Sequence, residues 1–271
     1  MRTIGFFSRF LKMMDSIIRY RKILKAITVV EFAKRYSGSV LGKLWILLYP
    51  IFLLSIYIFV YMVIFKMRFP GFSEFDYVLF VFAGLIPFLG LSESLSAGTV
   101  SIKQNIHLVK NVMLPIELVP VKIVLVSMVS QVVSMAILVV LAGANGSLGV
   151  NIVILPFVFV LQLMFLIGLV WILSAIAVPL PDVSYFVNLF ILLLMFVSPI
   201  GFKPEMVPEA FKLSLYLNPI YYMTEMYRHC IIYSSLPSLK LAMAYTALCV
   251  GTFVIGGAFF HKFKNVLVDY E

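Results

Sequence analysis

The stretch that decides the fold is FVSPIGFKPEMVPEAFKLSLYLNPIYYMTEMYRHC, residues Phe196–Cys230, which lies between two long apolar runs. Prolines divide it into pieces too short to cross a bilayer, because a helical span needs about 20 residues. The pieces are nevertheless apolar and aromatic. Backbone that is neither a full-length helix nor a barrel survives at membrane depth only where protein or a water-filled cavity surrounds it. The stretch therefore predicts two short re-entrant helices within 203–230, packed over the mouth of a pathway. A loop lying on the membrane surface is the alternative.

The composition around this stretch is that of an integral membrane protein. Of 271 residues, 63% are hydrophobic and only 12% are charged, and the mean hydropathy is +1.09. A soluble domain would carry about 25% charged residues. The first 43 residues hold ten Lys/Arg and no apolar core with a small-residue cleavage site, so we expect no cleaved signal peptide.

Six apolar runs follow one another and predict an all-α fold with a single transmembrane domain over 1–271. The predicted spans are 41–65, 77–97, 119–141, 150–176, 185–200 and 239–260. The fifth makes a helix of only about 24 Å at 1.5 Å per residue, which is shorter than a hydrocarbon core. We therefore expect its end to run into the broken stretch.

A basic amphipathic helix is predicted before the first span, at residues 14–36. Apolar residues of one face recur at the helical period: Ile17, Tyr20, Ile23, Leu24, Ile27 and Val30. The other face carries Arg21, Lys22 and Lys25. Such a helix lies in the interface of an anionic leaflet. A solvated helix of a small cytoplasmic cap is the alternative.

Charge orients the spans. With the N-terminus inside, the cytoplasmic segments hold 15 of the 21 Lys/Arg and the outer segments hold 6. The positive-inside rule favours this orientation, with both termini in the cytoplasm. It places the Phe196–Cys230 stretch on the outer side. The net charge of +9 then reflects membrane topology, and we expect no nucleic-acid partner.

The sequence offers little chemistry of its own. Around Gly38 and Gly42 the spacing is one residue short of a phosphate-binding loop, and Leu44 stands where Ser or Thr is required. Two cysteines and three histidines show no metal-ligand spacing. We therefore expect no catalytic residue, metal site or cofactor in this chain. Glu93 is the one acidic residue well inside an apolar run, which indicates either a functional site or a hydrogen-bonded structural role.

The cytoplasmic segment SIKQNIHLVKNVMLPIELVPVK, residues 101–122, has an intermediate polarity. It is too polar to be buried in lipid and too apolar to be merely solvated. A short helix that docks on a cytoplasmic partner explains both properties.

Taken in order, several segments resemble the permease subunit of type-2 ABC exporters, in particular those that move O-antigen, capsule or teichoic-acid polymers. They are RYSGSVLGKLWILLYP (35–50), NIHLVKNVMLPIELVP (105–120), PDVSYFVNLFILLLMFVSPIGF (181–202), LNPIYYMTEMYR (217–228) and FHKFKNVLVDY (260–270). One departure is that Pro181 precedes Asp182 where the family often carries an Arg-Asp pair. A basic contact at that turn is therefore in doubt.

The resemblance implies a homodimer in the bacterial inner membrane, joined to two copies of a cytoplasmic ATP-binding-cassette subunit that uses ATP and Mg. The chain would export a lipid-linked polysaccharide, with O-antigen as the expected cargo, and would not itself be an enzyme. Residues 105–115 would form the coupling helix. Its expected ATPase contacts are Asn105, Leu108, Val109, Lys110, Asn111, Met113 and Pro115.

Aromatic and basic side chains are the candidates for the substrate pathway, since sugars stack their C–H faces on aromatic rings. The candidate lining residues are Trp45, Tyr49, Phe52, Tyr57, Tyr61, Tyr185, Phe186 and Phe190. Aromatic residues that face lipid or pack between helices are the alternative. Arg35 and Lys43, at the inner end of the first span, could meet a pyrophosphate or a lipid headgroup.

Residues of the broken stretch are the candidates for an outer gate: Pro199, Asn218, Pro219, Tyr222, Glu225 and Arg228. Glu225 and Arg228 are three residues apart, so one helical face can bring them together. We expect that pair to be structural.

Three rival functions remain open. An ion-coupled secondary transporter would show ionisable groups at mid-membrane and internal repeats, whereas this chain offers only Glu93. A membrane enzyme would need convergent acids or histidines. A permease for drugs or other small molecules shares the architecture, and the basic N-terminal helix and the ordered motifs argue against it.

Overall fold

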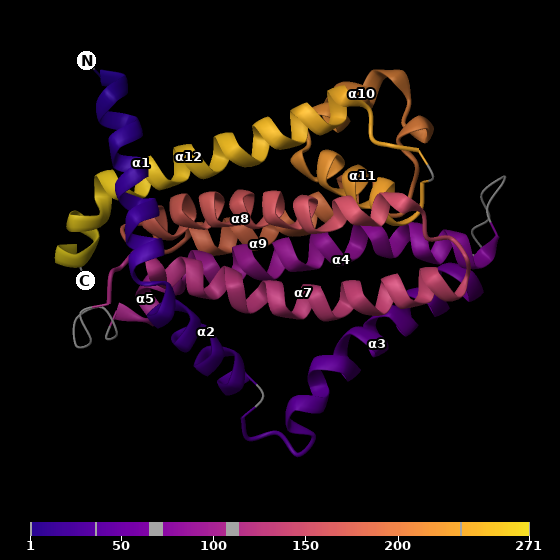
Figure 1. Ribbon diagram of the computed structural model, residues 1–271, viewed down its shortest axis with the longest axis horizontal. Helices are drawn as coiled ribbons and strands as arrows, with labels where there is room; N and C mark the ends of the chain where they lie inside the picture. Colours follow the sequence, from indigo (N-terminus) through magenta and orange to yellow (C-terminus); the bar gives the residue numbers. More distant parts are fainter. Residues whose placement is uncertain (1, 36, 65–72, 107–113, 234, 271) are drawn as a thin grey trace.

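The long helices lie side by side along one axis (Figure 1). The computed structural model describes residues 2–35, 37–64, 73–106, 114–233 and 235–270. The bundle contains α4 (Glu74–Thr99), α7 (Leu118–Ala144), α8 (Leu155–Ala177), α9 (Val183–Val197) and α12 (Leu239–Tyr270). Around it lie α1 (Arg2–Arg19), α2 (Arg21–Arg35), η1 (Gly42–Leu44), α3 (Trp45–Ile58), η2 (Phe59–Ile64), α5 (Ser101–Gln104), η3 (Val150–Ile154), η4 (Pro204–Met206), η5 (Glu209–Phe211), α10 (Lys212–Leu217) and α11 (Pro219–Ile231).

Among the described residues, four helical segments are long and apolar enough to cross a membrane, which agrees with the predicted all-α integral membrane protein. They are Phe75–Thr99, Leu118–Ala144, Val150–Ala177 and Leu239–Lys264. The remaining two predicted spans fall on shorter apolar helices, Trp45–Ile58 and Val183–Val197. The six-span topology therefore stays a prediction, and so does the assignment of residues 1–271 to one transmembrane domain.

The N-terminal region forms two helices where the sequence pattern predicts one at 14–36. The chain turns at Tyr20, so one helical wheel does not describe both sides of the turn. On α2, Leu24 is buried, but Ile23 lies about 100° around the helix and is exposed. Val30, seven residues after Ile23, is also exposed. The predicted apolar face is thus partly buried against the bundle and partly exposed, and its placement in the membrane interface stays a prediction.

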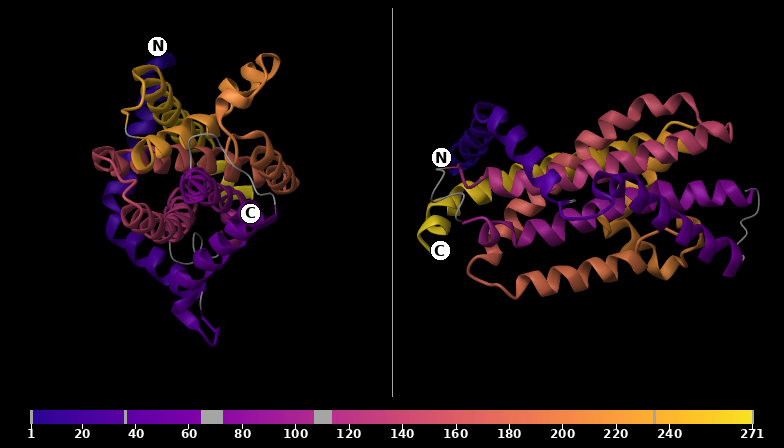
Figure 2. Two further views of the ribbon diagram at one scale, coloured as in Figure 1. Left: turned by 90° about the vertical axis from the view of Figure 1, so that its right-hand side faces the viewer. Right: turned by 90° about the horizontal axis from the view of Figure 1, so that it is seen from below.

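The two N-terminal helices pack on different sides of the bundle. α1 crosses α12 near the end where both termini lie, and the rings of Phe10 and Phe253 meet edge to face with centroids 5.4 Å apart. α2 packs on α7. In the view along the bundle, α2 and α3 lie on one side and α10 rises on the opposite side (Figure 2). In Figure 1, α2 and α3 lie below α7 and form a V whose tip points away from the bundle.

Glycines allow the helices of the bundle to touch backbone to backbone. A Cβ at Gly168 of α8 would run into the backbone of Thr252 and Phe253 of α12, and a Cβ at Gly256 would run into the backbone of Gly168. Beside this contact the ring of Trp171 stacks on that of Phe253 at 5.5 Å. Small residues are the usual basis of close helix packing in membranes, where apolar burial drives association little.

The close contact between Gly168 and α12 predicts that an added methyl group destabilises the protein at Gly168 but not at an uncrowded glycine. We expect Gly168→Ala to destabilise the protein by about 1–3 kcal/mol, because overpacking forces the backbones apart. Gly251→Ala on α12 is the matched control, since a Cβ there meets nothing within 4 Å. Unfolding temperature in mild detergent is the measurement. Equal effects of the two substitutions would contradict the packing described.

Candidate functional site

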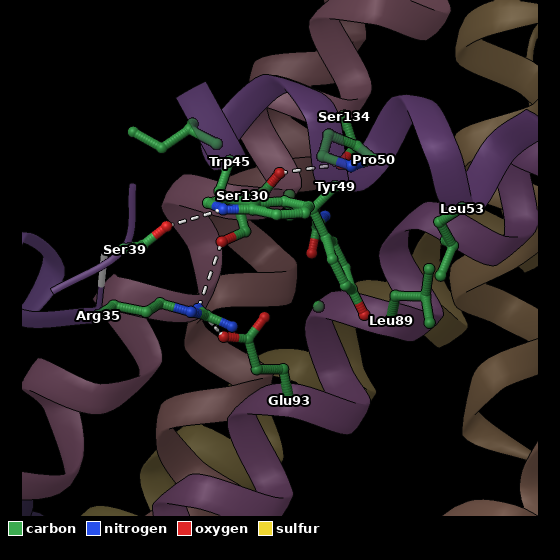
Figure 3. A pocket seen from close by; sticks show the side chains of 13 residues that line it. Arg35, Ser39, Trp45, Tyr49, Pro50, Leu53, Leu89, Glu93, Ser130 and Ser134 are labelled. Carbon is green, nitrogen blue, oxygen red and sulfur yellow. Dashed lines mark hydrogen bonds and ion pairs between the residues drawn. The ribbon is translucent and has the colours of Figure 1, made fainter. Parts of the chain in front are cut away.

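A cavity of about 340 Å³, with a mainly apolar wall that also carries a few charged and hydroxyl groups, lies between α2, α3, α4 and α7 (Figure 3). The guanidinium Nη1 of Arg35 forms an ion pair with Glu93 Oε1 and lies 3.4 Å from Ser130 Oγ. The indole of Trp45 donates a hydrogen bond to Ser39 Oγ at 2.9 Å. The full lining is Arg35, Ser39, Trp45, Ile46, Tyr49, Pro50, Leu53, Leu89, Gly90, Glu93, Ser130, Gln131 and Ser134. The cavity thus combines a charged pair, hydroxyl groups and aromatic rings.

The inner wall of the cavity belongs to a buried hydrogen-bond network. Gln131 donates to Gln162 Oε1 at 2.7 Å, and Gln162 donates to the Pro87 carbonyl at 3.0 Å. The hydroxyl of Tyr227 donates to the same Gln162 oxygen. Gly90 makes room for this network, because a Cβ there would collide with Gln131 Oε1. The network ties α4, α7, α8 and α11 together beside the cavity.

Arg228, on α11, is a fully buried charged group. Its side chain is 0% exposed and bonds to Glu225 Oε1 at 2.7 Å and to the Ile200 carbonyl at 2.7 Å. The guanidinium carbon lies 3.5 Å from the ring centroid of Phe80 on α4. A Cβ at Gly84 would lie 3.3 Å from Thr224 and 3.4 Å from Arg228 of α11, so α11 packs close against α4. The predicted Glu225–Arg228 ion pair is confirmed, and Arg228 joins α11 to α4 and to the turn that follows α9.

The remaining gate candidates position the start of α11. The Asn218 side chain accepts a hydrogen bond from Ile220 N at 2.9 Å and donates to Ser198 Oγ at 2.9 Å. Pro219 occupies the first turn of the helix, where its missing donor costs nothing. The Tyr222 hydroxyl donates to the Tyr216 carbonyl at 2.8 Å. Pro199 is buried.

The segment that leads into α11 is exposed by contrast. Glu209 pairs with Lys212 on α10, and this hydrogen bond raises the pKa of Lys212 above its ordinary value. Both α10 and α11 are short helices at the predicted place in the chain. Their re-entrant placement and gating role stay predictions.

The structure brings together only part of the predicted pathway. Arg35, Trp45 and Tyr49 line the cavity with Glu93. The other aromatic candidates lie elsewhere: Phe52 is exposed, Tyr57 packs partly against the core, and Tyr185, Phe186 and Phe190 are exposed on α9. The side chains of Lys43 and Tyr61 lie outside the described part of the chain.

The predicted ATPase contacts are described only at their two ends. Leu108, Val109, Lys110, Asn111 and Met113 lie outside the described residues. Asn105 accepts a hydrogen bond from Lys122 Nζ at 2.9 Å, and Pro115 is partly buried.

Sequence reasoning missed the polar residues that hold the site together. Lys122, Gln131 and Gln162 are buried within apolar spans, and Glu31 and Ser130 contact charged groups from other helices. A glutamine or lysine inside an apolar run is a signal that could have found the first three.

Comparison with known proteins places the chain in a transporter class. Residues 22–232 match the family model of ABC-2 type transporter membrane domains, so the chain belongs to the ABC-2 type transporter family.

Curated relatives indicate which kind of transporter in this family the chain resembles. The chain is similar to the O-antigen export system permease protein RfbA of Myxococcus xanthus, with 28% identity over 243 residues, which cover 89% of this chain and 92% of the relative. Two proteins of the same name from Klebsiella pneumoniae are each 25% identical over 89% of this chain and 92% of their own length.

The Arg228 contacts generate a stability prediction. Arg228→Met leaves the Glu225 carboxylate beside apolar surroundings without its partner, so we expect a loss of about 3–5 kcal/mol of stability. Lys212→Met removes the other i,i+3 pair of the same stretch, which is exposed, and should change little. Thermal unfolding in detergent compares the two variants. An Arg228→Met protein as stable as Lys212→Met would contradict the structural role of the buried pair.

Proposed function

We propose that this chain is the membrane-spanning permease subunit of an ATP-driven exporter that moves a lipid-linked O-antigen polysaccharide from the cytoplasmic to the outer side of a bacterial inner membrane. Membership of the ABC-2 family supports the transport role. Relatives named as O-antigen export permeases, aligned over most of the chain, support the cargo.

The observation that carries the proposal is the chemistry of the cavity. The rings of Trp45 and Tyr49 can stack on the C–H face of a sugar. Glu93, Ser130 and Ser134 offer oxygen atoms to sugar hydroxyls. A volume of about 340 Å³ falls in the range of small-molecule sites, so the cavity has room for the head of a lipid-linked glycan and not for a long polymer.

Arg35 supplies the remaining feature that such a substrate needs. Its guanidinium lies at the cavity wall with Glu93 and Ser130, and the delocalised cation is suited to a diphosphate. An arriving diphosphate would compete with Glu93 for Arg35. Binding of the substrate head would then change the contact between α2 and α4 directly.

The energy for transport comes from outside the chain in this proposal. Two copies of an ATPase subunit bind ATP and Mg and contact residues 105–115 of two permease copies, which form a homodimer around the pathway. A partner shifts a conformational equilibrium only by its different affinity for the two states. Closure of the ATPase pair on ATP would supply that difference. α10 and α11 would gate the outer exit, and both termini would lie in the cytoplasm.

The pairing of Glu93 weighs against the rival ion-coupled transporter. A proton-coupling acid must exchange its proton during transport, whereas Glu93 is paired with Arg35 and lies among hydroxyl groups. This arrangement suits recognition of a polar substrate.

Cavity aromatics should matter for export in cells. We expect Tyr49→Ala to lower the appearance of polymer at the cell surface by about tenfold, the equivalent of about 1.4 kcal/mol of lost interaction. Lipid-linked polymer should accumulate inside. The matched control is Phe157→Ala, which removes an aromatic ring exposed on α8 outside the cavity. Normal export by Tyr49→Ala would contradict the role of the cavity.

The partner should be found by mild-detergent purification from native membranes. We expect an ATPase subunit that carries a phosphate-binding loop to co-purify with the tagged chain in equal amounts. Mass spectrometry of the purified complex identifies it. A chain that emerges without any ATPase under every condition tried would overturn the exporter proposal.

A further inference from the structure

A buried lysine lies at the cytoplasmic end of α7, and no part of the proposed transport cycle yet uses it. The Lys122 side chain is 1% exposed. Its Nζ donates to Glu31 Oε2 at 2.8 Å and to Asn105 Oδ1 at 2.9 Å. A buried ammonium without partners is strongly unfavourable, so these two acceptors stabilise the buried Lys122 side chain.

One acceptor is the first residue of the predicted coupling segment. Asn105 ends α5, and its amide nitrogen donates to the Ser101 carbonyl at 2.9 Å. This bond leaves the amide oxygen free to accept from Lys122. The ammonium of Lys122 therefore joins the start of residues 105–115 to α7.

The other acceptor belongs to α2, which also reaches the cavity. Glu31 and Arg35 are four residues apart and lie on the same face of this helix. Arg35 pairs with Glu93 of α4 at the cavity wall (Figure 3). Glu31, which binds Lys122, and Arg35, which lines the cavity, are thus about one helical turn apart on α2.

We propose that Lys122 is a positioning residue that couples the segment beginning at Asn105 to the Arg35–Glu93 wall of the cavity, with α2 as the connecting element. Its role in transport rests on the proposed exporter function, in which that segment receives the ATPase. Movement of Asn105 changes the contacts of Lys122, releases or draws in Glu31, and so loosens or tightens α2 over the substrate site.

A second ion pair, just beyond residues 105–115, provides a contrast. Glu117, at the start of α7, lies 3.7 Å from Lys264 of α12, and its carbonyl accepts a hydrogen bond from the Trp171 indole of α8 at 3.1 Å. These contacts point toward α8 and α12 and include no residue that lines the cavity. Lys264→Met therefore removes an ion pair at the same end of the bundle without touching α2.

The test measures how readily the cavity opens, independently of transport. A cysteine replaces Ser134, which lines the cavity, and its labelling by a water-soluble methanethiosulfonate reagent is timed in native membranes that contain the whole complex. The protein without the added cysteine gives the background from the two native thiols, both of which are buried. We expect Lys122→Met and Glu31→Ala each to speed labelling about fivefold or more, the lower end of coupling between sites.

The control variants separate coupling from general loosening. Lys122→Arg keeps the charge and should label at close to the parental rate. Lys264→Met should leave the rate unchanged. Glu31 is 32% exposed, so Glu31→Ala carries the test if Lys122→Met does not fold. Parental labelling rates in folded Lys122→Met and Glu31→Ala would overturn the inference, and so would an equal increase in Lys264→Met.

Failure of this inference differs visibly from failure of the exporter proposal. Unchanged labelling combined with normal export by the parent protein refutes the coupling role of Lys122 alone. If Lys122→Met labels faster and the parent protein exports no polysaccharide, the coupling is supported and the proposed cargo is refuted.

Discussion

A polar group inside an apolar helical bundle must be satisfied by another part of the protein, because no bulk water is there to do it. This constraint organises the whole chain. Arg228 binds Glu225 and the Ile200 carbonyl in the turn after α9, and Lys122 binds Glu31 and Asn105; Arg35, which is partly exposed, pairs with Glu93 at the cavity. Each of these charges joins at least two helices that apolar contacts alone would hold less specifically.

The same constraint concentrates function where polar groups gather. The Arg35–Glu93 pair lies against hydroxyl groups and two aromatic rings, and the glutamine network behind it links four helices. A lipid-linked glycan has the matching character, with sugar faces, hydroxyls and a diphosphate on an apolar carrier. Paired charges at such a site can exchange partners with a substrate, which gives the chain a physical means to sense that the site is filled.

Local sequence patterns predict those features of the structure that depend on residues close together in the sequence. Hydropathy located the long helices because a span is apolar throughout, and the Glu225–Arg228 pair was predictable from its i,i+3 spacing. Arg35–Glu93 and Lys122–Glu31 were not, since their partners are separated by 58 and 91 residues. The cavity itself depends on these distant contacts.

The limits of the sequence patterns have equally specific causes. The helix predicted at 14–36 is divided at Tyr20, which nothing in its polarity signals. On α9, Tyr185 and Phe186 are exposed while Val187 is buried, and aromatic residues that face lipid, a second subunit or a pathway look the same in sequence.

The central claim is that a lipid-linked glycan binds in the cavity between α2, α3, α4 and α7. A photoreactive amino acid placed at Tyr49 tests it most directly, with the same residue placed at Phe157 on the exposed face of α8 as the reference. Illumination of native membranes should attach a polyprenyl diphosphate glycan at position 49 and only ordinary phospholipid at position 157. Ordinary phospholipid at both positions would contradict the account.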